Sequence, residues 1–596
     1  MIDSATWVGA HVVRNYVLSD PILDWLNIYG EQRGFIKDTQ LPDYDRRTDM
    51  SIFLFRKGVE FEEAVVRHLK TLTTVVTICT DPMQARAPDM TSRTIAAMRQ
   101  EIPIIHHGVL HDDIHQTYGC PDLIVRSDVL HKLFPQSLST EDAAVPAPAL
   151  KGVSFHYRIV DVKFTSLDLT VKGELGNSGS APAYKAQLFI YNRALGYAQG
   201  YLPSLSYVLG RGWKQAIRGE TSRGDSAMEL LAPVPQTGMV SKEKTIATVV
   251  DEACAWIRRV RSEGTGWVIL PQPSVSELRP NMGNTEDGPW VHAKKQIAEE
   301  LEELTLLWQV GPSKRDAANR SGIYSWKDKR CTAAAIGISG SERQPVLQAI
   351  LDINQKNEGP CVSPSRITAA EDVWREVPPL EFFVDFETVT DLNDDFSNFP
   401  QRGGCPMIFM IGCGHMENGQ WRFKCFTATA LTPSAEALII NNWFDHMDQV
   451  HQKIGTGVKH PVVYHWSPAE TSNLVTAYNA SVRRHPGKVD RWSSLQWFDF
   501  LKEVVRAEPV VVRGALGFGL KKIGRAMHQH GLIQTFWDAG PVDGLGAMVG
   551  AWWCDEEATK KRGRLNDIEL MKEIGRYNEV DCKVMMEIVR HLRARH

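Results

Sequence analysis

The chain has 596 residues, which is too many for one hydrophobic core, so we expect two or three domains. Apolar residues make up 43% of it and there are 17 Trp, a composition that excludes extensive disorder. The formal net charge is −4, from 67 Lys and Arg against 71 Asp and Glu, which excludes a polycation. Local basic patches on such a chain can still bind nucleic acid.

The ten cysteines are scattered and include no Cys-x-x-Cys pair, which argues against a zinc ribbon or a compact iron–sulfur clasp. Reduced thiols in a cytosolic protein are the simplest interpretation. The first residues show no charged leader followed by an apolar core, and no apolar run approaches the about 20 residues that span a bilayer. We therefore predict a cytoplasmic protein without a membrane partner.

The first predicted domain covers residues 1–270, and a proline-rich linker comes after it at 270–284. Apolar periodicity and β-branched runs indicate that this domain mixes helices and strands. The expected helices cover 56–69 and 183–195, and the expected strands cover 123–125 and 158–164.

Residues 271–379 are predicted to form a helical middle. The stretches 304–315 and 321–326 together resemble a helix-hairpin-helix, which would offer backbone N–H groups and the cations of Lys314 and Arg315 to a phosphate. Gln309 stands where that motif has its first glycine. An αα-hairpin that only packs against its neighbours is the alternative.

The third predicted domain covers residues 380–596 and opens with three strands, of which the second and third are joined through the tight-turn dipeptide Asn418-Gly419. Helices and strands then alternate. This is the order of elements in the RNase H fold, so we predict an α/β domain with a mixed five-stranded sheet. The expected strands cover 382–386, 406–413, 421–426 and 461–466, and helices begin near 434, 467 and 567.

The first candidate metal site centres on Asp161-Val162-Lys163. Residues i and i+2 of a strand share a face, so Asp161 and Lys163 should project together. The carboxylate can ligate Mg²⁺, while the ammonium can orient the attacking water or steady the scissile phosphate. Asp122 opens a neighbouring strand and Glu62 lies on an earlier helix, from which it could complete the ligands. Alone, Asp-x-Lys also occurs on exposed strands of alternating charge.

Gln187 and Tyr191 stand one turn apart on a predicted helix, a spacing that an amphipathic i, i+4 pair would also show. With the acidic residues they form a set that resembles the RecB-like branch of the PD-(D/E)XK nucleases. This resemblance implies metal ligands at Glu62, Asp122 and Asp161, a catalytic lysine at Lys163, and support for the site or for DNA from Gln187 and Tyr191. Some members of the branch carry an iron–sulfur cluster, but the early segment 16–20 has no cysteine, so no cluster is expected here.

The second candidate site contains Asp385 and Glu387, again i and i+2 on a strand. Two such carboxylates repel each other unless cations lie between them, which is the logic of a two-metal centre. Tyr577 and Asp581 share a face of the last helix, where the carboxylate could complete the metal cage and the hydroxyl could hold the nucleophilic water. The pattern resembles the tyrosine-bearing DEDD exonucleases of the RNase H superfamily.

That family has a further acidic ligand just past the central strand, and we assign this role to Glu470. Ser467 and Glu470 also spell a capping box, which is a purely structural alternative. Asp499 would then take the ligand role. If neither carboxylate binds metal, the domain is a degenerate nuclease fold that grips nucleic acid.

Two basic runs fall within the third domain and could follow a phosphate backbone, although short charge runs are usually solvated. They contain Arg483 and Arg484, and Lys560, Lys561 and Arg562.

Together these patterns predict a nuclease with two folds that uses Mg²⁺ or Mn²⁺, up to two ions per site, to hydrolyse DNA from ends or single strands. The alternatives are a nucleic-acid-binding scaffold with one degenerate fold, and a nuclease that processes RNA. The sequence contains no Gly-x-x-x-x-Gly-Lys-Ser/Thr, so any helicase activity would come from a partner in trans.

Overall fold

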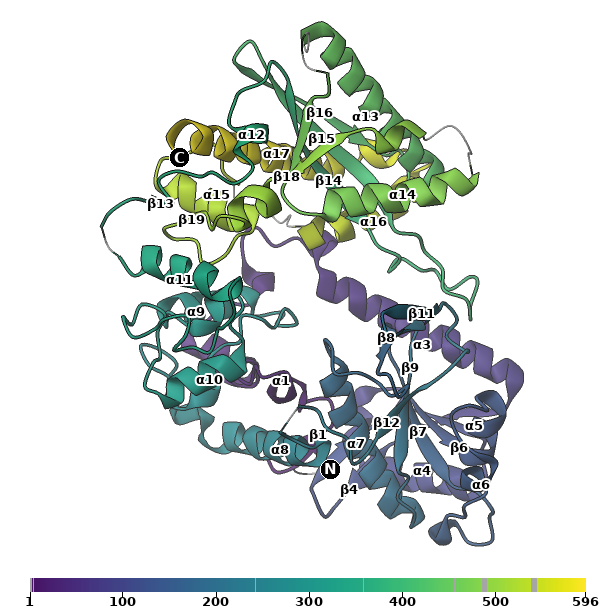
Figure 1. The fold of residues 1–596 in the computed structure, drawn as a ribbon. Helices are drawn as coiled ribbons and strands as arrows, with labels where there is room; N and C mark the ends of the chain where they lie inside the picture. Colours follow the sequence, from purple (N-terminus) through teal and green to yellow (C-terminus); the bar gives the residue numbers. More distant parts are fainter. Residues whose placement is uncertain are drawn as a thin grey trace. The chain divides into compact units, whose positions relative to one another are not determined.

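The computed structural model describes residues 3, 5–241, 243–356, 358–454, 457, 459–484, 490–537 and 544–596. It is a mixed α/β protein with several sheets, which confirms the predicted class (Figure 1). The chain divides into two compact units, each made of three separate stretches of the sequence. The first unit contains residues 1–37, 53–297 and 392–404, and the second contains 38–52, 298–391 and 405–596.

The first unit is built on a six-stranded mixed sheet of order β12-β9-β7-β6-β3-β2. The central pair, β6 and β7, is antiparallel, with Leu123 opposite Val160. These strands are rich in Val and Ile, as the sequence predicted, and both are buried. The strands are β2 (Val75–Thr77), β3 (Ile104–His106), β6 (Leu123–Arg126), β7 (Tyr157–Val162), β9 (Leu205–Leu209) and β12 (Ala232–Pro235).

Two long helices flank this sheet. The helix α3 (Met50–Leu72) places Phe61 in one hydrophobic core with Val160 and Val162 of the β7 segment. The helix α7 (Ala181–Gln199) packs on β7 as well. The other helices of this unit are α1 (Arg14–Val17), α2 (Ile22–Trp25), α4 (Pro88–Arg99), α5 (Ser127–Leu133), α6 (Thr140–Ala143), α8 (Ile246–Glu263) and α9 (Val291–Glu300). One small sheet has the order β1-β5-β4, with β1 (Val8–Gly9), β5 (Thr117–Gly119) and β4 (Leu110–Asp112). A second has the order β11-β10-β8, with β11 (Glu220–Gly224), β10 (Gly212–Ile217) and β8 (Ser166–Leu169).

The segment predicted as a linker is irregular in backbone but is fixed by a buried polar network. The Lys294 ammonium donates to Asp20 Oδ2 at 3.0 Å and to the Asn281 carbonyl at 3.1 Å. The Asn281 amide donates to Asp20 Oδ1 at 2.8 Å. Lys294 and Asp20 are fully buried, so this ion pair needs the surrounding hydrogen bonds to offset the loss of hydration.

The second unit is built on a five-stranded sheet of order β16-β15-β14-β17-β18. The first three strands are antiparallel, and β17 and β18 run parallel to β14. Asn418 and Gly419 both have positive φ, at 51° and 76°, as the tight turn between β15 and β16 requires. The strands are β14 (Glu381–Val389), β15 (Met407–Glu417), β16 (Gln420–Thr427), β17 (Val462–His465) and β18 (Gln496–Asp499).

Helices cover both faces of this sheet. Phe386 of β14 packs against Trp443 of α13, with ring centroids 5.5 Å apart, whereas its neighbour Asp385 accepts a hydrogen bond from Asn578 of α17. Adjacent strand residues point to opposite faces, so α13 and α17 lie on opposite sides of the sheet. The long helices of the unit are α13 (Pro433–Ile454), α14 (Ala469–Arg484), α15 (Leu520–Gln529), α16 (Gly544–Lys561) and α17 (Glu569–Arg595).

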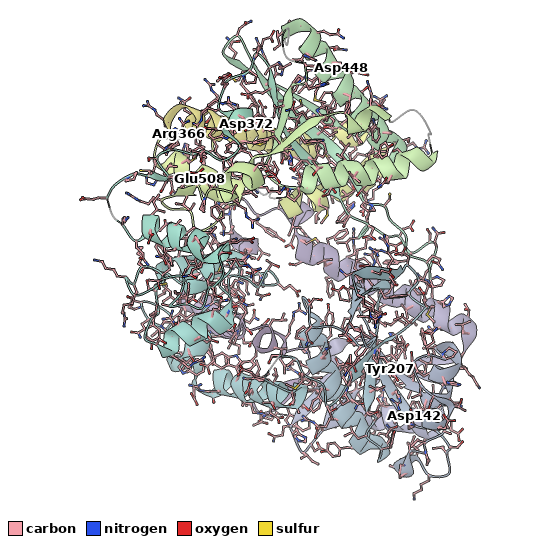
Figure 2. All side chains as sticks on the ribbon, in the orientation of Figure 1. Asp142, Tyr207, Arg366, Asp372, Asp448 and Glu508 are labelled. Carbon is pink, nitrogen blue, oxygen red and sulfur yellow. The ribbon has the colours of Figure 1, made fainter. Side chains whose placement is uncertain are left out.

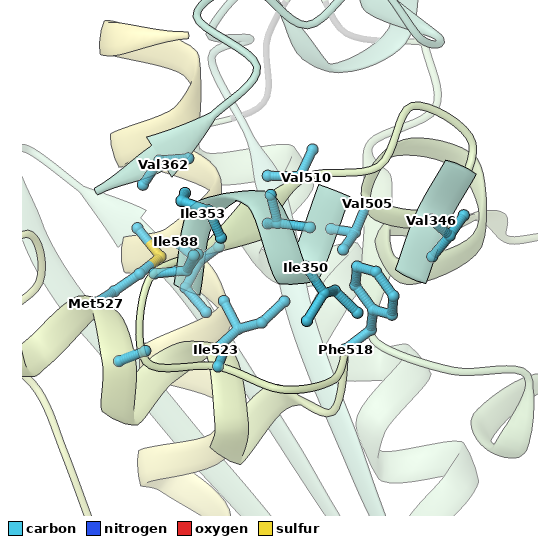
Figure 3. Packing of buried hydrophobic residues seen from close by; sticks show 14 of the residues in the cluster. Val346, Ile350, Ile353, Val362, Val505, Val510, Phe518, Ile523, Met527 and Ile588 are labelled. Carbon is cyan, nitrogen blue, oxygen red and sulfur yellow. The ribbon is translucent and has the colours of Figure 1, made fainter. Parts of the chain in front are cut away.

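The predicted helical middle contains shorter helices than its sequence indicated. The helices α10 (Pro312–Arg320) and α11 (Arg343–Asn354) are separated by turns over 321–342, and α12 (Glu371–Trp374) and the strand pair β13 (Val362–Ser363) and β19 (Val511–Val512) complete this region. Figure 3 shows Ile350 and Ile353 of α11 packed with Ile588 of α17 in the core of the second unit. The carboxylate of Glu508, labelled in Figure 2, accepts from the amides of Thr368 (2.7 Å) and Ala369 (2.9 Å) and fixes the segment before α12.

Within the described residues, no helix is both long and apolar enough to cross a membrane. All ten cysteines are free.

Candidate metal centres

The first centre lies in the first unit, where β6 and β7 bring three of the predicted residues together. Asp161 and Lys163 project to one side of β7, and the Lys163 Nζ lies 2.6 Å from Asp161 Oδ2 and 3.9 Å from Asp122 Oδ2. The Val162 amide donates to Asp122 Oδ2 at 2.7 Å, which fixes the neighbouring carboxylate beside the strand. The Asp-x-Lys therefore lines a largely buried site rather than an exposed strand face.

Burial and mutual repulsion dominate the electrostatics of this site. Burial raises the pKa of Asp122 well above its usual range, and the charge of Asp161 raises it further. Burial lowers the pKa of Lys163, but the Asp161 and Asp122 carboxylates outweigh that effect and raise it. Asp161 Oδ1 is buried without a hydrogen-bond partner among the described residues. A buried carboxylate oxygen that accepts no hydrogen bond is suited to act as a ligand of a cation.

Gln187 and Tyr191 of α7 lie at this centre and contact each other. Gln187 Nε2 donates to the Tyr191 hydroxyl at 2.7 Å. Burial raises the pKa of Tyr191, and the charges of Asp161 and Asp122 add to the effect, which places the phenol close to both carboxylates. A Cβ atom at Gly119 would lie 2.1 Å from Tyr191 Cε1, so the absence of a side chain there makes room for the tyrosine ring.

Glu62 of α3 contacts two histidines that the sequence patterns did not single out. Its Oε1 lies 2.9 Å from His106 Nε2 and 2.6 Å from His107 Nε2. Burial raises the pKa of Glu62, but hydrogen bonds from both imidazoles outweigh it and lower the pKa to about 2. The His107 amide donates to the Asp122 carbonyl at 3.0 Å, so the pair lies beside the first centre. The His-His doublet at the end of an apolar strand was the available sequence signal.

The second centre lies in the second unit on β14 and α17. Ligand atoms of Asp385, Glu387 and Asp581 all lie within 4.8 Å of one another. Two neighbours hold the carboxylates by hydrogen bonds: Asn578 Nδ2 donates to Asp385 Oδ2 at 2.7 Å, and Trp537 Nε1 donates to Asp581 Oδ1 at 2.8 Å. The fold thus brings the expected strand pair and the expected helix residue to one point.

Excess negative charge is the dominant property of this second centre. Burial first, and then the charge of Asp581, raise the pKa of Asp385 well above its usual range and that of Glu387 to about 8. Burial also raises the pKa of Asp581 to about 6. Lys521 opposes all three shifts, and no sequence pattern had singled it out. Its Nζ lies 4.6 Å from the centre of the Tyr577 ring.

Glu470 is buried at the start of α14, and its charge raises the pKa values of Asp385, Glu387 and Asp581. Its Oε2 lies 3.3 Å from His465 Nδ1. Asp499, at the end of β18, instead accepts a hydrogen bond from the Lys502 amide at 3.0 Å. Glu470 therefore lies in electrostatic contact with the acidic group, while Asp499 caps the adjoining turn.

The predicted basic residues have mixed surroundings. Lys314 donates to the Gly337 carbonyl at 2.9 Å, and the buried Arg315 lies 2.9 Å from Asp316. Lys560 and Lys561 both pair with Glu557, and Arg562 is exposed with a positive φ. Arg483 and Arg484 end α14, but their side chains lie outside the described residues.

Comparisons of the chain with models of protein families, with curated proteins and with solved structures find no match.

Proposed function

We propose that this chain is a metal-dependent nuclease with two catalytic centres, one in each unit. The observation that carries the proposal is the convergence of Asp385, Glu387 and Asp581 within 4.8 Å, in a site where burial and mutual repulsion disfavour their charged forms. Carboxylates gathered in this way are stabilised by divalent cations between them. A purely structural role would pair them with cations of the protein, whereas Lys521 faces an excess of acids.

The arrangement of strands supports the same proposal. A sheet of order β16-β15-β14-β17-β18, with three antiparallel strands followed by two parallel ones, is the arrangement expected for an RNase H-like domain. In the first unit, Asp122 at the start of β6 and Asp161-x-Lys163 at the end of β7 are arranged as the resemblance to PD-(D/E)XK nucleases implies. We assign the two units to these two folds.

At the first centre, Asp122 and Asp161 would hold Mg²⁺ or Mn²⁺, which supplies a polarised water and charge stabilisation at the phosphate. Lys163 stays protonated, since both carboxylates raise its pKa, and its ammonium can steady the negative charge that develops on the scissile phosphate. The hydrogen bond from Gln187 to Tyr191 fixes both side chains at the site, where they would limit the access of bulk water. Glu62, which we expected among these ligands, contacts His106 and His107, and its charge contributes to the raised pKa of Asp122.

At the second centre, Asp385, Glu387 and Asp581 would hold up to two ions with Glu470 as the further ligand. Asn578 and Trp537 each donate to one carboxylate and so leave its other oxygen for the cation. Tyr577 lies on the same helix face as Asp581, where its hydroxyl can position the attacking water. Lys521 beside the tyrosine ring supplies a cation toward the substrate phosphate.

We take DNA as the substrate, cleaved exonucleolytically at ends or on single strands, with Lys314, the basic run at the end of α16 and Arg483 and Arg484 as candidate backbone contacts. Cleavage of labelled single-stranded and double-stranded DNA and RNA by the full-length protein, with Mg²⁺, Mn²⁺ or EDTA, tests the proposal. Asp161→Asn and Asp385→Asn should each remove one set of products, and the exposed Asp113→Asn and Asp372→Asn serve as matched controls. Cleavage that persists in EDTA or in the double variant would contradict it, and RNA cleavage alone would reassign the substrate.

A further inference from the structure

Glu62, His106 and His107 form a nitrogen-containing cluster beside Asp122 of the first centre. Both imidazoles direct Nε2 at one carboxylate oxygen, at 2.9 and 2.6 Å, and the three ligand atoms lie within 4.8 Å of one another. The two rings are stacked, with centroids 3.8 Å apart. The side chains retain exposed fractions of 14–32%, so a further ligand can reach the cluster from solvent.

The outer nitrogens of the two rings indicate where the protons lie. His107 Nδ1 lies 3.2 Å from the Cys79 carbonyl, which can only accept, so this nitrogen carries a proton. His106 Nδ1 lies 3.0 Å from the Thr77 hydroxyl, which can accept from it in the same way. Without a metal, each Nε2 donates its hydrogen to the Glu62 oxygen. A cation that binds among the three atoms displaces these Nε2 protons to solvent and takes the two Nε2 lone pairs and the carboxylate oxygen as ligands.

Hydrogen bonds from the outer nitrogen to a backbone carbonyl or hydroxyl are what ligating histidines make in metal sites. The backbone conformation also brings the two imidazole rings to the same side. Neighbouring residues of a strand normally point to opposite faces, but His107 leaves the strand with a positive φ of 51°, uncommon for a residue with a side chain. This conformation turns its ring to the side of His106.

We propose that Glu62, His106 and His107 bind a divalent transition-metal ion, such as Zn²⁺ or Fe²⁺, in preference to Mg²⁺ or Ca²⁺. Imidazole nitrogen suits the borderline transition metals, whereas Mg²⁺ and Ca²⁺ take oxygen ligands. Two nitrogens and one carboxylate with solvent access leave positions for water or for a substrate oxygen. The site stands on its own residues and does not require the chain to cleave phosphodiesters.

Visible absorption of Co²⁺ bound to the purified full-length protein tests this site without any assay of activity. We expect one Co²⁺ with intense d–d bands, displaced by equimolar Zn²⁺ but not by a large excess of Mg²⁺. His107→Gln should weaken binding at least tenfold, and His106→Gln with His107→Gln should abolish the bands. His115→Gln is the matched control, because His115 also pairs with a carboxylate, Asp112, at 2.9 Å in the same unit.

A measurement on the unmodified protein keeps the proposal testable if the double variant does not fold. Electron paramagnetic resonance of one equivalent of Cu²⁺ should show superhyperfine coupling to two ¹⁴N nuclei. A Cu²⁺ spectrum without ¹⁴N coupling would overturn the assignment, as would unchanged Co²⁺ bands in a folded double variant or displacement of Co²⁺ by Mg²⁺ as readily as by Zn²⁺. Loss of DNA cleavage would bear only on the proposed function.

Discussion

Gly119→Ala should show directly whether close packing holds Tyr191 at the first centre. A Cβ at this position would lie 2.1 Å from Tyr191 Cε1, 2.7 Å from Cδ1 and 3.2 Å from the Ala10 Cβ. Ordinary carbon contacts are about 3.5–4.0 Å, so the tyrosine ring must move by more than an ångström. Tyr191 is only 4% exposed, so its ring is enclosed by neighbouring groups that must adjust to such a movement.

The cost can be estimated from two contributions. Overpacking of a well-filled core costs about 1–3 kcal/mol, and loss of the 2.7 Å hydrogen bond from Gln187 adds about 1 kcal/mol. We therefore expect Gly119→Ala to lower the stability of the first unit by about 2–4 kcal/mol. Its midpoint of thermal unfolding should fall by several degrees.

Gly58→Ala is the matched control, since Gly58 lies within α3 of the same unit and an added methyl group there would meet no heavy atom within 4 Å. Alanine is favoured over glycine within a helix by about 0.5–1 kcal/mol, so this change should stabilise the unit. Differential scanning calorimetry of both variants measures the opposite signs. A Gly119→Ala protein that unfolds at or above the temperature of the unmodified chain would refute the packing argument.

Two further predictions concern cleavage. Lys163→Met should reduce cleavage at the first centre by about a hundredfold or more, because it removes a cation directed at the phosphate, and single-turnover rates in saturating Mn²⁺ measure this. In an Asp161→Asn background, where only the second centre acts, Glu470→Gln should cause a loss of similar size. In the same background Asp499→Ala should leave the rate unchanged and cost about 1 kcal/mol of stability through the lost turn cap. The reverse ranking of these two variants would transfer the ligand role to Asp499.

Patterns of period two and the turn dipeptide predicted four of the five strands in the sheet of the second unit, whereas β18 had no predicted range. The runs around Phe382, Ile408 and Val463 are apolar and β-branched or aromatic, and each forms a strand close to the predicted range. Asp385 and Glu387 could be placed on one face because strand periodicity is local. Asp581 could be placed near them only through the resemblance, since no local rule brings residue 581 to residue 385.

The features that the sequence did not reveal depend on tertiary structure or on single dihedral angles. His106 and His107 are adjacent, and the strand pattern assigns them to opposite faces, so only the positive φ of His107 reveals their convergence. Lys521 lies on α15, and the amphipathic pattern of this helix predicts only that its polar side chains face solvent. The packing of residues 392–404 within the first unit, with Phe396 against Phe61 at 5.6 Å, has no local signal either.

The two centres differ in charge balance, and this difference gives the last prediction. In the first centre Lys163 lies 2.6 Å from Asp161 and offsets part of the acidic charge. In the second, Lys521 faces three carboxylates, those of Asp385, Glu387 and Asp581, and burial raises the pKa of Glu387 to about 8 and that of Asp581 to about 6. The folded state of metal-free protein thus keeps a proton on Glu387 that the unfolded chain releases near its ordinary pKa of 4.5.

A carboxyl whose pKa is raised by folding stabilises the protein fully below its unfolded pKa and loses that contribution as pH rises through the folded value. The metal-free second unit should therefore become less stable between about pH 4.5 and pH 8, whereas saturating Mn²⁺, by stabilising the carboxylates, should abolish most of the loss. Calorimetry at about pH 6 and about pH 9, with EDTA or Mn²⁺, measures this, and Glu387→Gln should flatten the metal-free profile. Equal stability of the metal-free protein at both pH values would mean that the acidic group is already compensated within the protein, and the two-ion assignment would then lose its electrostatic basis.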